Sequence, residues 1–168
     1  MSKSQEYTSE KTSINKVTKV YKRFKFKENS IILDYGGGKY DTNKEYMKTL
    51  GCNLLVYDPY NRTEIENSYA LNYVMSNGGA DFIVCANVLN VIKEDDILLD
   101  ILNNLLLYAN SSTKFYIQVY EGDKSGIGKE TVKGYQRNEK TLNYIQMIKM
   151  VFKNYNIKRY ENIYEVWK

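Results

Sequence analysis

The sequence contains no histidine, only two cysteines and one proline, and no apolar run longer than a few residues. Without histidine, the serine and cysteine triads that depend on imidazole are excluded, and two cysteines are too few ligands for an ordinary zinc site. The short apolar runs exclude a transmembrane helix, and the polar first ten residues do not form a signal peptide. We therefore expect a cytoplasmic protein with reduced thiols, no metal and no membrane contact.

The remaining composition is sufficient for one domain of ordinary size. Of the 168 residues, 43% are hydrophobic, and a chain of this length buries roughly 68–70% of its unfolded surface. The two cysteines, Cys52 and Cys85, lie at or in apolar segments and are expected to be core thiols. Within a single domain over 1–168 we expect a flexible tail (1–11), a basic N-terminal helix (12–29), a cofactor-binding core (30–120), a loop or lid (121–138), and a helix followed by a β-hairpin (139–168).

Charge is distributed unevenly along the chain. The net charge of +4 is made up of +5 over residues 1–29, −5 over 30–120 and +4 over 121–168. Basic ends are typical of proteins that bind nucleic acid, but the abundant lysine, asparagine and isoleucine fit the codon bias of an AT-rich genome equally well. Both interpretations stay open. If the ends bind a polyanion, Lys129, Lys133 and Arg137 are expected to meet phosphates.

Apolar runs alternate with helical patterns in the centre of the sequence. Residues 30–34 and 53–58 each predict a buried strand that ends in an acid. Between them lie a glycine turn and a helix that is expected to begin with a capping box from Thr42 to Glu45 and to end at Gly51. Strand, turn, helix and strand form a βαβ unit, which predicts a parallel sheet.

The rest of the chain continues this alternation. Residues 81–85 and 114–120 predict two more strands, and 63–77, 93–108 and 139–152 predict helices. Residues 156–160 and 163–167 predict a hairpin. The predicted fold class is α/β, with a Rossmann-like open, mostly parallel sheet and a C-terminal antiparallel hairpin strand.

The glycine turn and its neighbouring acids predict a nucleoside-shaped site. Ligands of open α/β sheets bind beyond the carboxyl ends of the strands, where Asp34 precedes the glycines and Asp58 can accept hydrogens from both ribose hydroxyls. In the dinucleotide motif G-x-G-x-x-G, Gly36 and Gly38 would fill the first two places and Asp41 the third. A carboxylate there would repel a pyrophosphate, whereas the cations of S-adenosylmethionine suit Asp34. The residues therefore favour S-adenosylmethionine over NAD.

Three segments resemble the class I S-adenosylmethionine-dependent methyltransferases: residues 31–38, 56–59 and 81–92. The resemblance covers about residues 30–120. The whole chain, including residues 120–123 and 134–138, is also similar to methyltransferase-like proteins carried by phages and mobile elements. Residues 34–41 with 87–92 resemble methyltransferases linked to DNA phosphorothioation systems.

The resemblance implies a role for each matching residue. Asp34 and the glycines would hold the methionine end, Asp58 the ribose hydroxyls, and Asn87 and Val88 would line the pocket beside the sulfonium. The resemblance also exposes two departures: Tyr40 replaces the final glycine of the motif, and the stretch 59–80 is too short for the usual helix, third strand and adenine-contacting acid. The sheet is thus expected to be abbreviated around the usual third strand. The expected cofactor-binding residues are Asp34, Tyr35, Gly36, Gly37, Gly38, Asp58, Pro59, Asn87 and Val88.

The expected function is transfer of a methyl group from S-adenosylmethionine to a small-molecule or nucleic-acid acceptor. A general base is needed only where the acceptor holds its proton tightly. The candidate catalytic residues are Glu121 and Asp123, which follow the fourth strand, although both also fit solvated loop acids. Tyr35 and Asn87 are further candidates. The alternative is a non-catalytic protein on the same fold that binds S-adenosylmethionine or nucleic acid.

Overall fold

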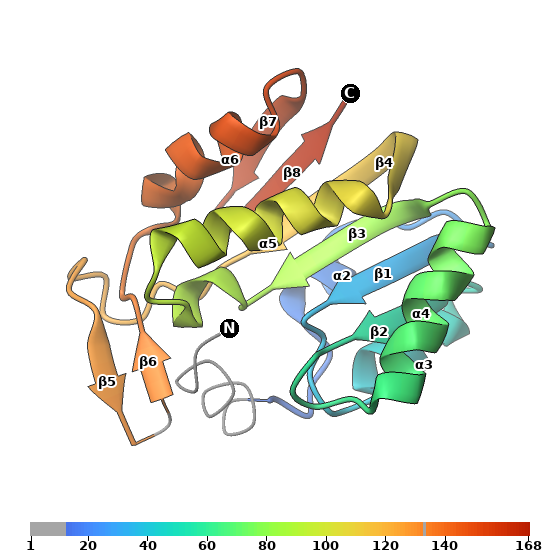
Figure 1. Cartoon of the computed structure of the whole chain (residues 1–168), viewed down its shortest axis with the longest axis horizontal. Coiled ribbons are helices and arrows are strands. Elements are labelled where there is room, and N and C mark those ends of the chain that lie inside the picture. The colour runs from blue at the N-terminus through green and yellow to red at the C-terminus, as the bar shows by residue number, and fades with distance from the viewer. Residues whose placement is uncertain (1–12, 133) are drawn as a thin grey trace.

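The computed structural model describes residues 13–132 and 134–168. A six-stranded sheet with the order β2-β1-β3-β4-β8-β7 forms the centre of the molecule (Figure 1). The first four strands in that order are parallel, and β8 and β7 are antiparallel to their neighbours. The predicted α/β class, with a mostly parallel sheet and a C-terminal hairpin, is confirmed. The strands are β1 Ile31–Tyr35, β2 Asn53–Tyr57, β3 Ala80–Ala86, β4 Ala109–Gln118, β7 Asn156–Tyr160 and β8 Ile163–Trp167.

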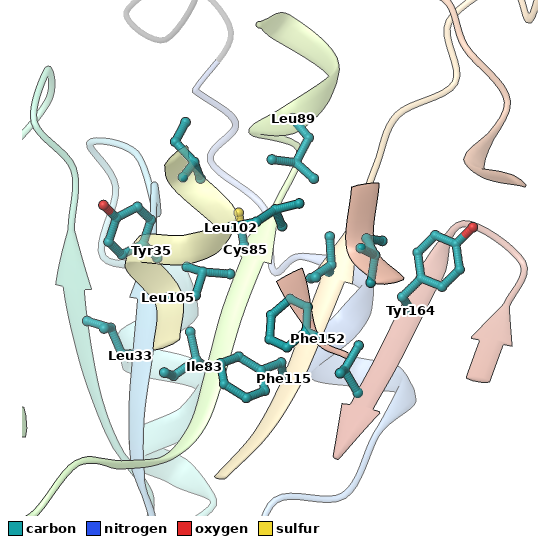
Figure 2. Close-up of a cluster of buried hydrophobic side chains, with 14 of the residues drawn as sticks. Leu33, Tyr35, Ile83, Cys85, Leu89, Leu102, Leu105, Phe115, Phe152 and Tyr164 are labelled. Atoms are coloured by element: carbon teal, nitrogen blue, oxygen red, sulfur yellow. The ribbon is translucent and has the colours of Figure 1, made fainter. Parts of the chain in front are cut away.

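Helices cover both faces of this sheet. On one face, α4 (Glu64–Ser76), α5 (Asp95–Leu107) and α6 (Ile145–Val151) bury apolar side chains against the strands, and Figure 2 shows part of this core. On the other face lie α2 (Lys19–Arg23) and α3 (Thr42–Thr49). Because successive strand residues point to opposite faces, Ile32 packs in the second cluster and Leu33 in the first.

The sheet is short on the β2 side, as the sequence predicts. The chain between β2 and β3 holds only α4, so β2 forms the edge of the sheet. A capping box at the start of α4 fixes where this helix begins: the Thr63 hydroxyl accepts from the Glu66 backbone N–H at 3.2 Å, and the Glu66 carboxylate accepts from the Thr63 backbone N–H at 2.8 Å. This compact connection replaces the longer one that a further strand would need.

The N-terminal basic helix is much shorter than expected. Within the described residues 13–29, only Lys19–Arg23 is helical, and Thr18, which has extended backbone, ends the irregular segment that precedes it. Val20 and Tyr21 are nevertheless buried, so the short helix packs on the domain. The predicted tail of residues 1–11 lies outside the described residues.

Three further local features differ from the prediction: a helix cap, a loop and a helix. The capping box at Thr42 is not formed, because Asp41 is the N-cap and Thr42 is already the first helical residue; the Thr42 hydroxyl donates to the Asn15 side chain. The loop over 121–138 contains a two-stranded hairpin, β5 (Lys129–Thr131) and β6 (Gly134–Gln136). The predicted helix over 139–152 is divided into a 3₁₀ turn, η2 (Thr141–Tyr144), and α6, and another 3₁₀ turn, η1 (Leu89–Val91), follows β3.

Both cysteines lie in the core. Cys52 and Cys85 are free and buried, as predicted for core thiols. Over 13–132 and 134–168, no helix is long and apolar enough to cross a membrane. The same residues contain no cluster of three or more side chains that could hold a metal ion.

Candidate functional site

A cavity of about 840 Å³ lies at the carboxyl ends of the four parallel strands. Its walls come from the N-terminal segment 13–19, the turn after β1, and the segments that follow β2, β3 and β4. This volume is in the range of small-molecule and cofactor sites. All nine residues that the sequence predicts for cofactor binding line it: Asp34, Tyr35, Gly36, Gly37, Gly38, Asp58, Pro59, Asn87 and Val88.

The glycine turn is held tightly against β2 and the segment after β3. The N–H groups of Gly36 and Gly37 donate to the Tyr57 carbonyl at 2.7 and 3.3 Å. Gly36 has φ +82°, and a Cβ there would lie 2.4 Å from Val88 Cγ2. Glycine is therefore required at position 36 because the backbone packs against Val88, and not because a ligand approaches it.

Asp58 joins the glycine turn to the start of the chain after β2. Its Oδ2 accepts from the Gly38 N–H at 2.9 Å, and its Oδ1 accepts from the N–H groups of Tyr60 and Asn61 at 2.9 and 3.0 Å and from the Asn61 side chain at 3.2 Å. A carboxylate has about four acceptor positions, so Oδ2 retains capacity for a ligand hydroxyl. Asp58 is 2% exposed yet lines the cavity.

Asp41 does not act as the sequence argument assumes. It is absent from the cavity wall, and its Oδ1 accepts from Arg62 Nη1 at 2.7 Å. The same guanidinium donates to the carbonyls of Gly38 and Tyr40 at 2.9 and 3.0 Å. Because Arg62 neutralises Asp41, repulsion of a pyrophosphate by Asp41 is not a valid argument against NAD. Asp34 and Asp58 remain the two carboxylates in the described wall of the cavity.

The buried Asp34 carboxyl has a pKa well above that of an ordinary aspartate. Burial raises its pKa to about 6, and hydrogen bonding from Asn43 works in the opposite direction. Asn43 Nδ2 donates to Asp34 Oδ2 at 3.3 Å. A ligand cation beside Asp34 would favour the ionised carboxylate and lower this pKa.

We expect the affinity for S-adenosylmethionine to rise with pH up to about 6 and to level off above it. A cation binds the ionised Asp34 better than the protonated form, so the gain is at most tenfold per pH unit below the pKa. Calorimetric titrations between pH 5 and 8 measure this dependence. In Asp34→Asn the slope should vanish, and an unchanged slope in that variant would assign the titration to another group.

The two candidate bases lie elsewhere, which revises the role expected for them. Neither Glu121 nor Asp123 is part of the cavity wall. Glu121 Oε1 accepts from the Thr141 N–H and hydroxyl at 2.7 and 2.9 Å, and these bonds lower its pKa. Hydrogen bonds from Ser125 and an ion pair with Lys129 at 3.0 Å lower the pKa of Asp123 to about 2. Both carboxylates hold the loop together and are poor proton acceptors at neutral pH.

Tyr35 is also a poor base. Its ring packs against Tyr57 and Tyr108, with centroids 4.7 and 6.3 Å away. Burial raises the pKa of its hydroxyl far above neutrality. Tyr40 lines the cavity but is 37% exposed, so it narrows the site without filling it.

Carboxamide side chains on the β3–β4 side of the cavity were missed by the sequence argument. Asn90, Gln118 and Gln136 line this wall together with Asn87. Gln118 is the last residue of β4, so its position at a strand end was a usable signal. Gln136 belongs to β6, and nothing in the sequence indicated that this hairpin reaches the cavity.

The N-terminal segment forms a wall of the cavity, which explains why it is not helical. The Thr18 N–H donates to Asn43 Oδ1 at 2.9 Å, and Asn43 Nδ2 donates to the Thr18 hydroxyl at 3.0 Å. These two bonds fix the end of the irregular segment 13–18 to α3. Side chains from 13–19 therefore cover the glycine turn from the second face of the sheet.

The basic side chains of the loop do not form a free phosphate-binding set. Arg137 donates to Asp95, Glu139 and the Ile92 carbonyl at 2.7, 3.0 and 2.9 Å, and its side chain is only 9% exposed. Lys129 is paired with Asp123, and Lys133 lies outside the described residues. The expectation that Arg137 meets a phosphate is wrong, because it anchors the hairpin to the segment after η1.

Replacing Arg137 by lysine is expected to lower the free energy of unfolding by about 1–2 kcal/mol, because an ammonium cannot reproduce the planar array of donors. Denaturant unfolding measures the effect. Arg159→Lys is the matched control, since Arg159 is exposed and its cost should stay below about 0.5 kcal/mol. Equal costs for the two variants would show that Arg137 is not an anchor.

The comparisons with known proteins give a fold but no family. No family model and no curated protein sequence matches the chain. The solved structure "PigF with SAH" has a TM-score of 0.58 at 16% identity and covers 88% of this chain and 53% of its own. The 1,6-didemethyltoxoflavin-N1-methyltransferase of Burkholderia thailandensis has a TM-score of 0.58 at 14% identity, with coverages of 83% and 69%. The O-methyltransferase NcsB1 from neocarzinostatin biosynthesis has a TM-score of 0.59 at 14% identity, with coverages of 88% and 51%.

The chain spans about half the length of PigF and of NcsB1. At these identities the likeness shows the fold alone, which is the Rossmann-like fold of S-adenosylmethionine-dependent methyltransferases.

Proposed function

We propose that this protein binds S-adenosylmethionine and transfers its methyl group to a small-molecule acceptor. The observation that carries the proposal is the single cavity in which the glycine turn, Asp34 and Asp58 meet at the carboxyl ends of β1 and β2. The two carboxylates suit the cations and the ribose of this cofactor. Asp34 and Asp58 also suit S-adenosylmethionine better than NAD, because the pyrophosphate of NAD is negatively charged, and this argument does not depend on Asp41.

The solved structures support the same cofactor. PigF is described with S-adenosylhomocysteine, and the toxoflavin enzyme with that product and 1,6-didemethyltoxoflavin. NcsB1 is described with S-adenosylmethionine and 2-hydroxy-5-methyl naphthoic acid. Because Asp34 and Asp58 line the β1–β2 half of the cavity, we infer that this half holds the cofactor and that the β3–β4 half holds the acceptor.

In this arrangement the protein would act mainly by positioning. The sulfonium supplies a reactive methyl group, so the chain's own task is to hold the acceptor in line and to exclude water. Asn87 and Val88 follow β3 between the two halves, and Val88 lies against Gly36. They are therefore the residues that we place beside the transferred methyl group.

A protein that binds S-adenosylmethionine without turnover is the second candidate. It is favoured by the position of Glu121 and Asp123 outside the cavity and by the lack of any carboxylate on the described β3–β4 wall. A nucleic-acid acceptor is less favoured, because Arg137 and Lys129 are engaged in ion pairs.

Native mass spectrometry of the purified protein tests the proposed cofactor. We expect a species heavier by the mass of S-adenosylmethionine or its demethylated product, and no NAD adduct. Formation of S-adenosylhomocysteine on addition of acceptor mixtures then separates the transferase from the non-catalytic binder. Retention of NAD, with no binding of either sulfur compound, would contradict both candidates.

A further inference from the structure

The two halves of the cavity differ in charge. Asp34, Asp58 and Lys39 line the β1–β2 half, and Lys16 and Lys19 come from the N-terminal segment, whereas no described lining residue from Ala86 onward carries a charge. Lys19, which lies at the edge shared with the β7–β8 turn, donates to Asn162 Oδ1 at 3.2 Å and is paired with Glu161. The β3–β4 half thus presents a polar but uncharged wall.

Two pairs of carboxamides on this wall are oriented by backbone donors. In the first pair, the Val20 N–H donates to Gln118 Oε1 at 3.1 Å, and Gln118 Nε2 donates to Asn87 Oδ1 at 3.3 Å. A backbone N–H can only donate, so it fixes which end of Gln118 is the oxygen. Gln118 must then present its NH₂ group to Asn87, whose own NH₂ group is left over.

The second pair repeats this arrangement. The Tyr120 N–H donates to Asn90 Oδ1 at 3.3 Å, and Asn90 Nδ2 donates to Gln136 Oε1 at 3.1 Å. In each pair, the chain of hydrogen bonds begins at a backbone N–H and ends at a side-chain NH₂ group, which belongs to Asn87 in the first pair and to Gln136 in the second. Neither terminal NH₂ group donates to any residue within 13–132 or 134–168, and neither is among the buried polar atoms without a partner.

We propose that the NH₂ groups of Asn87 and Gln136 recognise an uncharged acceptor that carries oxygen or nitrogen lone pairs beside its nucleophilic hydroxyl. This inference rests on the proposed function and names the substrate class of the same site. A wall that offers donors and no counter-ion favours a neutral carbonyl-bearing or heteroaromatic hydroxyl compound over an ammonium.

The chemistry of transfer is consistent with such an acceptor. The hydroxyl oxygen supplies the electron pair for the new O–CH₃ bond, and the S–CH₃ bond breaks toward sulfur to give the thioether. The hydroxyl proton passes to solvent water, because the described β3–β4 wall holds no carboxylate to accept it. A hydroxyl group acidified by a neighbouring carbonyl or ring nitrogen loses that proton readily, whereas an alkyl alcohol does not.

Isosteric acid variants test the proposal without changing side-chain shape. Gln136→Glu keeps the oxygen that accepts from Asn90 and replaces only the NH₂ donor, and Asn87→Asp does the same opposite Gln118. Asn87 has φ +59°, which aspartate also tolerates. The control is Asn72→Asp on the exposed side of α4, away from the cavity.

The probes are salicylamide, which is neutral and carries a carbonyl beside its hydroxyl, and tyramine, which is a cation. Each is titrated calorimetrically into protein saturated with S-adenosylhomocysteine. We expect the unmodified protein to bind salicylamide and not tyramine. Gln136→Glu and Asn87→Asp should each weaken salicylamide binding about tenfold, the scale of one lost hydrogen bond with a poorly matched partner, and should gain binding of tyramine.

Three outcomes would overturn the assignment. They are tyramine binding in preference to salicylamide, no saturable salicylamide binding by the unmodified protein, and unchanged salicylamide affinity in folded variants. Asn72→Asp should match the unmodified protein throughout. A failure of the unmodified protein to bind S-adenosylhomocysteine in the first step would count against the proposed function, and is thereby distinguished from failure of the acceptor assignment.

Discussion

Replacing Asp58 by alanine is expected to weaken the binding of S-adenosylhomocysteine by about 1.5–3 kcal/mol, roughly ten- to a hundredfold in dissociation constant. The variant loses the free acceptor position of Asp58 Oδ2, which has room for one ribose hydroxyl. It also loses the bond that holds the Gly38 N–H and the bonds to the N–H groups of Tyr60 and Asn61. Calorimetry gives the affinity.

Two controls make the Asp58 result interpretable. Glu64→Gln removes an acid from the first turn of α4, away from the cavity, and should leave the affinity unchanged. Circular dichroism and denaturant unfolding of Asp58→Ala establish that the variant is folded. An unchanged affinity in the folded variant would remove Asp58 from the cofactor site.

Gly36→Ala is expected to lower the free energy of unfolding by about 2–4 kcal/mol, from a strained left-handed backbone together with overpacking. The new Cβ would meet Val88 Cγ2 at 2.4 Å, and backbone strain at φ +82° adds to the collision. The turn would move away from the segment after β3, so cofactor binding should weaken as well. Denaturant unfolding measures the loss of stability.

A double-mutant cycle separates the collision from the backbone strain. Combining Gly36→Ala with Val88→Ala removes the colliding methyl group and should restore at least about 1 kcal/mol relative to additivity. Gly126→Ala is the matched control, because Gly126 has φ +73° but no atom within 4 Å of an added Cβ. Additive effects of the two changes, with Gly36→Ala no costlier than Gly126→Ala, would contradict the packing account.

The central strands and the β1–β2 half of the site were predictable for the same physical reason. Buried parallel strands are short apolar runs, and ligand-binding residues follow their carboxyl ends. The runs that end at Asp34 and Asp58 therefore indicated both the strands and the acids that line the cavity. The abbreviation of the sheet followed from the length of the connection between β2 and β3.

Features that depend on tertiary contacts were not predictable. The apolar spacing in 13–24 indicates a helix, but residues 13–18 are irregular and line the cavity, and the bonds between Thr18 and Asn43 hold the end of this segment against α3. Nothing local to Asp41 shows that Arg62 neutralises it, and nothing in the loop shows that Arg137 is buried. Glu121 and Asp123 follow the correct strand, yet their partners within the loop hold them away from the cavity.

Calorimetric titration of the purified protein with S-adenosylhomocysteine and, separately, with NAD tests the account most directly. The arrangement of Asp34, the glycine turn and Asp58 in one cavity predicts saturable binding of S-adenosylhomocysteine at a micromolar scale, about −8 kcal/mol, and no binding of NAD. Binding of NAD without binding of S-adenosylhomocysteine would contradict it.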